Sequence, residues 1–189
     1  MSANEAKRVI LNAVIELIDK KPLNKLSIRE IAKKAGMNSA AISYYFGSKE
    51  ILFNETMKYY WGNLCCIYER ILAEKQLTPD IIHSYCKEIM YFYFKSSGIL
   101  RSEQSNFMEQ GINQDTKQRI ELQLKAIGQI ILSVKPQTKK EELIVKTIRF
   151  ICSLAHPALF AESFDRIAPG EMAFDDFLNR YITDIIENI

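Results

Sequence analysis

Histidine and cysteine are the side chains in this chain whose spacing first suggests chemistry. His83 and Cys86 lie three residues apart, so one helical turn would bring the imidazole and the thiol together. A nucleophilic pair also needs an acid that orients the histidine, and none stands at a clear spacing. The four cysteines follow no metal-finger or C-x-x-C spacing, and no histidine pair or acid cluster suggests a metal. The sequence therefore predicts reduced and mostly buried thiols, with no catalytic centre, metal or cofactor.

A second group of residues, in the stretch NSAAISYYFGSKE at 38–50, suggests binding rather than catalysis. A short helix here would carry small side chains on its outward face, which lets a helix approach base edges without bulk. Tyr44 and Tyr45 can reach phosphates with their hydroxyls, while Phe46 turns inward. Lys49 opens the next helix, where an ammonium and free backbone amides can meet one phosphate. A solvated lysine is the commoner case, but this position favours nucleic-acid contact. The small outward residues are Ser39, Ala40, Ala41 and Ser43.

Three helices are predicted to position these residues. The apolar spacing predicts a first helix from Asn4 to Lys20, which Pro22 stops. The sequence SIRE, residues 27–30, predicts a capping box that opens a second helix, and Gly36 can end that helix in the left-handed conformation. Asn38 then caps a third, short helix. Two short helices joined at a glycine make a helix-turn-helix, and an ordinary helical hairpin would not need the small outward residues.

The charge of the chain is unevenly distributed. Residues 1–50 contain nine basic and five acidic residues, a net charge of +4, whereas the remainder contains 16 basic and 18 acidic residues. A basic head on a slightly acidic body favours a polyanionic partner for the head, although a solvated basic face would look the same. The opening residues lack an apolar signal core, and no apolar run is long enough to span a membrane. We therefore expect a cytoplasmic protein.

Beyond residue 48 the pattern predicts only further helices. Strand signals are scarce, and glycine and proline are few, which favours an all-α chain. The sequence SSG at 96–98 is expected to break a helix, and TKKE at 138–141 is expected to form a second capping box. The expected helices are 49–73, 78–95, 102–109, 114–134, 138–156 and 172–187.

The segment LSIREIAKKAGMNSAAISYYFGSKEILF resembles the DNA-binding head of the TetR/AcrR family of bacterial transcriptional regulators, over about residues 5–53. The resemblance implies an all-α fold with an N-terminal three-helix helix-turn-helix DNA-binding domain at 1–48. It also implies a larger helical ligand-binding and dimerisation domain at 49–189. Positions 40 and 41 are both alanine where such proteins often have Gly or Pro and Thr or Ser, so contact with a thymine methyl group is the expected use. The DNA contacts that the family implies are Ser27, Arg29, Ser39, Ala40, Ala41, Ser43, Tyr44, Tyr45 and Lys49.

The resemblance also implies a ligand cavity in the body, and an aromatic and sulfur-rich group of side chains is the candidate lining. Such stripes at helical spacing are more often plain core, so both readings stay open for each residue. The candidates are Trp61, Tyr68, Cys86, Met90, Tyr93, Phe107 and Met108.

The last two long helices carry more apolar surface than one body needs to close its core, which favours a two-fold interface. Internal core is the alternative for about half of these residues. The candidate interface residues are Ile144, Ile148, Ile151, Tyr181, Ile182 and Ile185.

Three hypotheses of function follow. The leading one is a homodimeric repressor that binds a palindromic double-stranded DNA operator and is released by a small-molecule effector. A small helical enzyme that uses the body cavity is the first alternative, but no assembled nucleophile, base and oxyanion set supports it. A helical adaptor that binds only proteins is the second, and it would not need the basic head.

Overall fold

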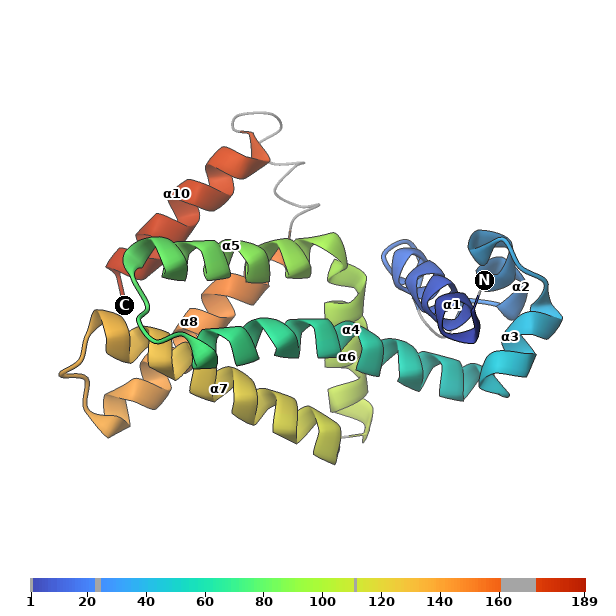
Figure 1. Ribbon diagram of the computed structural model, residues 1–189, viewed down its shortest axis with the longest axis horizontal. Coiled ribbons are helices and arrows are strands. Elements are labelled where there is room, and N and C mark those ends of the chain that lie inside the picture. The colour runs from blue at the N-terminus through green and yellow to red at the C-terminus, as the bar shows by residue number, and fades with distance from the viewer. Residues whose placement is uncertain (1, 23–24, 111, 161–172) are drawn as a thin grey trace. The chain divides into compact units, whose positions relative to one another are not determined.

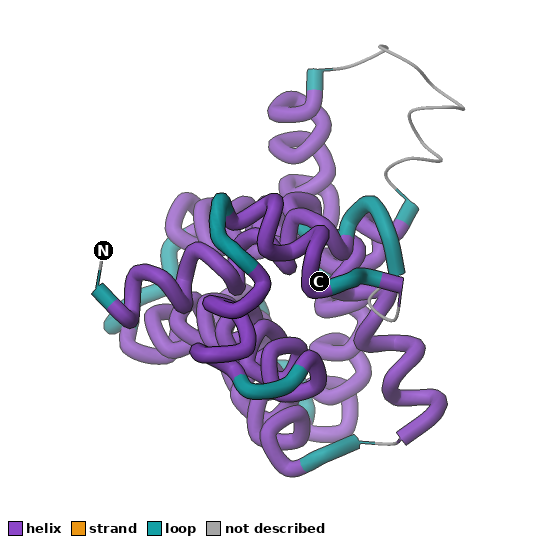
Figure 2. Tube along the Cα trace, turned by 90° about the vertical axis from the view of Figure 1, so that its right-hand side faces the viewer, coloured by secondary structure: helices purple, strands orange, loops and turns teal. Residues whose placement is uncertain are grey.

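The computed structural model describes residues 2–22, 25–110, 112–160 and 173–189, and these residues form helices without a strand (Figure 1; Figure 2). The predicted all-α class is confirmed. No helix in these ranges is long and apolar enough to cross a membrane. The helices are α1 (Ala3–Ile18), α2 (Ile28–Ala35), α3 (Ser39–Phe46), α4 (Lys49–Ala73), α5 (Pro79–Lys95), α6 (Ser97–Gln110), α7 (Gln114–Val134), α8 (Lys140–Leu159) and α10 (Phe174–Glu187).

The chain packs as two compact units. The first contains residues 1–63 and 96–111, and the second contains residues 64–95 and 112–189. The first unit therefore holds α1, α2, α3, the first part of α4, and α6. These units are defined by packing alone. The predicted boundary between a DNA-binding domain and a ligand-binding domain after residue 48 stays a prediction.

Helices α1 to α3 form the head of the first unit. Ser2 and Glu5 make a capping box at the start of α1, and the apolar face of that helix is buried through Ile10 and Val14. Ile31 of α2 and Ile42 of α3 are likewise buried, and α2 packs against both α1 and α3. These apolar stripes hold two helices as short as eight residues each, which would not be stable alone.

The second unit is a helical body. Helix α5 packs against α8 and α10, and α7 packs against α8. The central helix α5 buries six side chains, which explains its predominantly apolar sequence. The buried side chains of α5 are Ile82, Tyr85, Cys86, Ile89, Met90 and Tyr93.

Three details of the predicted helices are corrected. Only Ser96 separates α5 from α6, and Gly98 lies inside the first turn of α6 rather than in a break. The second capping box is not formed, because the N-cap of α8 is Lys139 with no side-chain hydrogen bond, and the Thr138 hydroxyl donates to the Lys135 carbonyl instead. Helix α8 also continues beyond His156, with Pro157 inside it. The predicted start of the last helix at Met172 lies outside the described residues.

Candidate DNA-binding surface

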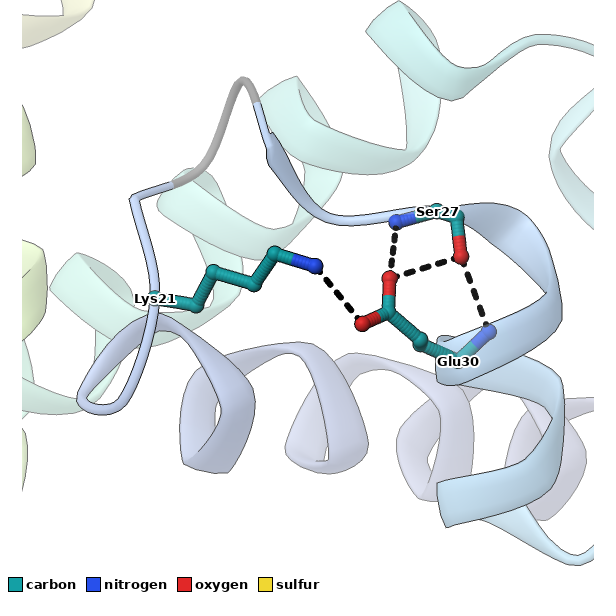
Figure 3. Close-up of polar contacts among 3 residues, drawn as sticks. All are labelled: Lys21, Ser27 and Glu30. Atoms are coloured by element: carbon teal, nitrogen blue, oxygen red, sulfur yellow. Dashed lines mark hydrogen bonds and ion pairs between the residues drawn. The ribbon is translucent and has the colours of Figure 1, made fainter.

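The start of α2 is fixed by a small polar network (Figure 3). The Ser27 hydroxyl accepts a hydrogen bond from the Glu30 amide at 3.2 Å, and the Glu30 carboxylate accepts from the Ser27 amide at 2.8 Å. Lys21, in the segment before α2, donates to the other carboxylate oxygen of Glu30 at 2.7 Å. The hydrogen bond from Lys21, followed by those from Ser27, lowers the pKa of Glu30 from 4.5 to about 2. The predicted capping box is confirmed, and the ion pair adds a tie to the preceding loop.

The turn between α2 and α3 uses a glycine and an asparagine. Gly36 has φ 67° and ψ 30°, and its amide donates to the Ala32 and Lys33 carbonyls, which ends α2. The Asn38 side chain then accepts from the Ala41 amide at 2.8 Å and caps α3. Both predictions are confirmed, and together they set the direction in which α3 leaves the turn.

Helix α3 has an outward face of small residues. Ala40 and Ser43 are exposed, while Ser39 and Ala41 are half-buried. The Ser43 hydroxyl donates back to the Ser39 carbonyl at 3.4 Å, a long bond that a better acceptor can replace. A rigid surface can therefore approach the backbone of α3 closely on this side.

Aromatic residues end α3. Tyr44 is 83% exposed, and its ring meets the ring of Tyr45 edge to face, with centroids 5.1 Å apart. Phe46 is buried, as predicted, and the Lys7 ammonium lies 5.6 Å from the centroid of its ring. An exposed tyrosine at a helix end has no role in the core, so its hydroxyl is available to an outside partner.

Helix α4 begins three residues after the end of α3, at Lys49. The Ser48 hydroxyl accepts from the Ile51 amide at 3.1 Å, which caps the helix as predicted. Lys49 is half-buried and its ammonium lies 5.2 Å from the centroid of the Phe53 ring. Stacking on a ring holds the stem of a lysine while leaving the ammonium able to bond further.

Within the described part of the head, some basic residues form ion pairs, whereas Arg29 does not. Lys21 pairs with Glu30 at 2.7 Å, and Lys34 pairs with Glu16 of α1 at 2.5 Å, so both are partly neutralised. Arg29, in the first turn of α2, is exposed and forms no ion pair within the residues that the structure describes. Its charge is therefore available to an external anion.

The candidate ligand residues are distributed over both units. Trp61 belongs to the first unit and is buried, with its ring edge to face against Tyr60 at 4.9 Å between centroids. Tyr68, Cys86, Met90 and Tyr93 belong to the second unit and are buried there. Burial raises the pKa of the Cys86 thiol to about 12, which keeps it protonated. The side chains of Phe107 and Met108 lie outside the described residues.

Within the second unit, two of these residues meet a third that the sequence analysis missed. The Gln123 amide nitrogen of α7 donates to the Tyr68 hydroxyl at 2.8 Å and to the Tyr93 hydroxyl at 3.2 Å. The two hydroxyls are 3.3 Å apart, and burial raises the pKa of Tyr68 well above its ordinary value. Gln123 falls among the apolar positions Ile120 and Ile127, and a polar residue on an apolar face is the signal that could have found it.

The candidate interface residues differ in burial. Ile144 and Ile148 of α8 are exposed, and Ile151 is half-buried. On α10, Tyr181 and Ile185 are half-buried, and the Tyr181 hydroxyl donates to the Ser153 carbonyl at 2.8 Å. Ile182 is fully buried inside the unit.

The head and its outward face define an all-helical protein of the helix-turn-helix class. Residues 10–56 match the family model described as bacterial regulatory proteins of the tetR family. The HTH-type transcriptional regulator BetI of Vibrio campbellii is 32% identical over 84 residues, which cover 44% of this chain and only 41% of that relative.

Solved structures of regulators resemble the fold of nearly the whole chain, and not of the head alone. A TetR transcriptional regulator from Legionella pneumophila superposes with a TM-score of 0.70 at 19% identity, covering 93% of this chain and 94% of that one. A tetR-family regulator from Streptomyces coelicolor gives 0.68 at 15% identity, covering 98% and 80% respectively. Over residues 10–56 this chain thus resembles the TetR family of bacterial regulatory proteins, and its fold resembles that of solved TetR-family regulators. As the sequence predicted, the matched family consists of regulators and not of enzymes.

Proposed function

We propose that this protein is a cytoplasmic transcriptional repressor that binds a palindromic DNA operator as a homodimer and is released by a small molecule. The observation that carries the proposal is the outward face of α3, where small residues are exposed beside Tyr44. The major groove of B-DNA admits one α-helix, and small side chains let the helix backbone approach the base edges. The family match over residues 10–56 supports the same assignment.

Each proposed DNA contact has a separate role. Ser39, Ala40, Ala41 and Ser43 lie in or beside the face that enters the groove, where an alanine contacts a thymine methyl group. Ser27, Tyr44 and Tyr45 offer hydroxyls to phosphates. Arg29 supplies an exposed cation at α2, and Lys49 supplies positive charge at the first turn of α4, where the amides of the helix start also favour an anion.

Binding to the DNA upstream of the protein's own gene tests the proposal directly. We expect fluorescence anisotropy to show a specific affinity at least about 1,000-fold above that for a random duplex of equal length. The affinity for both duplexes should fall steeply with salt, because phosphate contacts release counterions. Equal affinity for both duplexes, or no binding to either, would contradict the proposal, and the latter result would favour a protein-binding adaptor.

The proposed interface is the exposed apolar stripe of α8 together with the half-buried residues of α10. Val145, beside Ile144 and Ile148, is 64% exposed, and an apolar stripe of this kind is the usual mark of an association surface. Ile182 is left out of the proposed interface because its side chain is already fully buried. In a C₂ dimer a two-fold axis would place this stripe against its own copy, and apolar residues on both sides suit such a contact.

The effector is proposed to act through α4. This helix begins at Lys49 and carries both Trp61 and Tyr68, so one helix contributes residues to each of the two units. A ligand that binds one position of α4 better than another would shift operator affinity by about 5–150-fold, without touching DNA. A thermal-shift screen identifies ligands, because binding to the native state alone raises the melting temperature. Release of DNA by such a ligand should be weakened in a Tyr68→Phe variant, and unchanged release would contradict this route.

A further inference from the structure

The C-terminus of α1 and the N-terminus of α6 meet inside the first unit through Asp19. The Gly98 amide donates to the Asp19 carboxylate at 2.7 Å. Arg101, one turn further along α6, donates to the Asp19 carbonyl at 3.4 Å and to the Ser97 hydroxyl at 2.9 Å. Residues 79 positions apart in the chain therefore form one contact, the Asp19–Gly98 joint.

Glycine is required at position 98 for this joint. A β-carbon built on Gly98 would lie 2.5 Å from the Ile18 carbonyl oxygen and 2.7 Å from the α-carbon of Asp19. Both are backbone atoms, so the clash cannot be relieved by turning a side chain. Any other residue would force α6 away from α1. The glycine that the sequence suggested as a helix breaker is thus used for close helix contact.

Asp19 is unfavourably placed for its own helix. It is the C-cap of α1, where the partial negative charge of the helix end opposes a carboxylate. At the start of α6 the same carboxylate meets a free amide and the positive end of the helix dipole. The contact with α6 therefore offsets the local cost in α1, which is consistent with a role of the carboxylate in the joint.

The joint lies between two parts of the chain that have proposed roles. Two residues after Asp19, Lys21 pairs with Glu30 of α2, which starts the helix-turn-helix. On the other side, Ser96 alone separates α6 from α5, and Tyr93 of α5 belongs to the buried cluster with Tyr68 and Gln123. Gly98 thus follows Tyr93 by only five positions in the chain.

We propose that Asp19 and Gly98 are positioning residues that couple α6 to the helix-turn-helix, an inference that rests on the DNA-binding function proposed above. While the joint is closed, the segment that leads into α2 moves with the start of α6. DNA bound at α3 then restrains α6, and by linkage anything that displaces α6 changes DNA affinity by the same factor. Neither Asp19 nor Gly98 contacts DNA in this scheme.

Hydrogen exchange of the full chain, followed by mass spectrometry, tests the joint without DNA. In Asp19→Ala we expect amides at the start of α6 and in the last turn of α1 to exchange about tenfold faster or more, as loss of one charge-assisted hydrogen bond predicts. Asp19→Asn keeps an acceptor oxygen and should restore most of the protection. Gly98→Ala should behave like Asp19→Ala, whereas the control Gly62→Ala, where nothing lies within 4 Å, should not. Unchanged exchange in both Asp19→Ala and Gly98→Ala would overturn the joint.

The same measurement with bound DNA tests the coupling. A duplex from the protein's own upstream region should protect α3 and the start of α6 in the parent protein. In Asp19→Ala the duplex should still protect α3 but no longer protect α6, and Asp19→Asn should recover the protection. Equal protection of α6 in the parent and Asp19→Ala, or none in the parent, overturns the coupling alone. A parent protein that binds no duplex overturns the proposed function and the coupling with it, while the DNA-free exchange still decides the joint.

Discussion

Arg29 and Lys49 both offer positive charge to the proposed DNA surface, but their surroundings differ. Arg29 is exposed on α2, and its planar guanidinium can bond two acceptors of one base. Lys49 rests against the Phe53 ring at the first turn of α4, where backbone amides and the helix dipole already favour an anion. The first arrangement suits a base edge, and the second suits a phosphate of any sequence.

Replacing these two residues should separate the two roles. Arg29→Ala should cost about 1–3 kcal/mol in operator binding and should blur sequence preference. Lys49→Ala should weaken specific and random duplexes alike and reduce the slope of log affinity against log salt by about one. Affinities over a salt series decide between these outcomes. If both variants bind both duplexes as the parent does, the contacts are misassigned.

Glu30 makes the stability of the head depend on pH. Its folded-state pKa of about 2 lies below the ordinary value of 4.5, so the carboxylate stabilises the fold fully above about pH 5. This contribution is lost as the pH falls from about 4.5 through about 2, because the unfolded chain then takes up the proton first.

Urea unfolding at several pH values checks this dependence. We expect Glu30→Gln to flatten the loss of stability between pH 5 and pH 2. Lys21→Gln removes the largest single cause of the lowered pKa and should flatten it only in part, since the hydrogen bonds from Ser27 remain. A Glu30→Gln profile parallel to that of the parent would show that the network in Figure 3 is not formed in solution.

At the scale of elements, the head depends on how its short helices end. Gly36 ends α2 with φ at 67°, and nothing lies within 4 Å of the position that a β-carbon would take. A substitution there meets no steric obstacle from the rest of the protein, so its cost is that of the backbone conformation alone. Gly62, in the exposed middle of α4, has equally open space but no positive φ.

The same substitution at these two glycines should therefore have opposite effects. Gly36→Ala should destabilise the protein by about 1–2 kcal/mol, and Gly36→Asn by less, because asparagine tolerates the left-handed region. Gly62→Ala should stabilise it by about 0.5–1 kcal/mol, since alanine is the better helix former. Thermal unfolding of the three variants measures this. A stabilising Gly36→Ala would exclude the left-handed turn between α2 and α3.

For the whole molecule, the proposed dimer uses an apolar surface that one chain leaves exposed on α8. Ile148, on the stripe of α8, is 50% exposed, while Ile51, at the start of α4, is 51% exposed. The two residues are thus matched in type and exposure, but only the first belongs to the proposed interface. In a two-fold interface each residue occurs once in each subunit. One substitution to arginine therefore introduces two positive charges into the same interface.

Ile148→Arg should therefore yield monomers, and Ile51→Arg should not. Burying unpaired arginines costs about 3 kcal/mol or more, which raises the dimer dissociation constant by more than about 100-fold. Light scattering over a concentration series measures the change, and circular dichroism confirms that the variant stays helical. Dimers of parental affinity in Ile148→Arg would place the interface elsewhere.

The sequence by itself determined the features that depend on near neighbours. These features involve residues within a few positions of each other, or one amphipathic stripe, so local geometry largely determines them. They are the capping box of Ser27 and Glu30, the Asn38 cap, the Gly36 turn and the inward Phe46. The helix-turn-helix and the family resemblance rest on the same local pattern. The start of α4 at Lys49 likewise follows from the local cap at Ser48, and its end at Ala73 agrees with the approximate prediction.

Tertiary structure decided what depends on residues far apart in the chain. Gly98 belongs to a helix and not to a break, because its fit against Ile18 and Asp19 outweighs its poor helix propensity. Thr138 and Glu141 match a capping box in sequence, but the Thr138 hydroxyl bonds to Lys135 instead. Gln123 donates a hydrogen bond to Tyr68, which lies 55 positions away in the chain, and no local sequence rule relates the two residues. Such contacts follow from how whole helices pack, since packing brings together side chains that the sequence keeps apart.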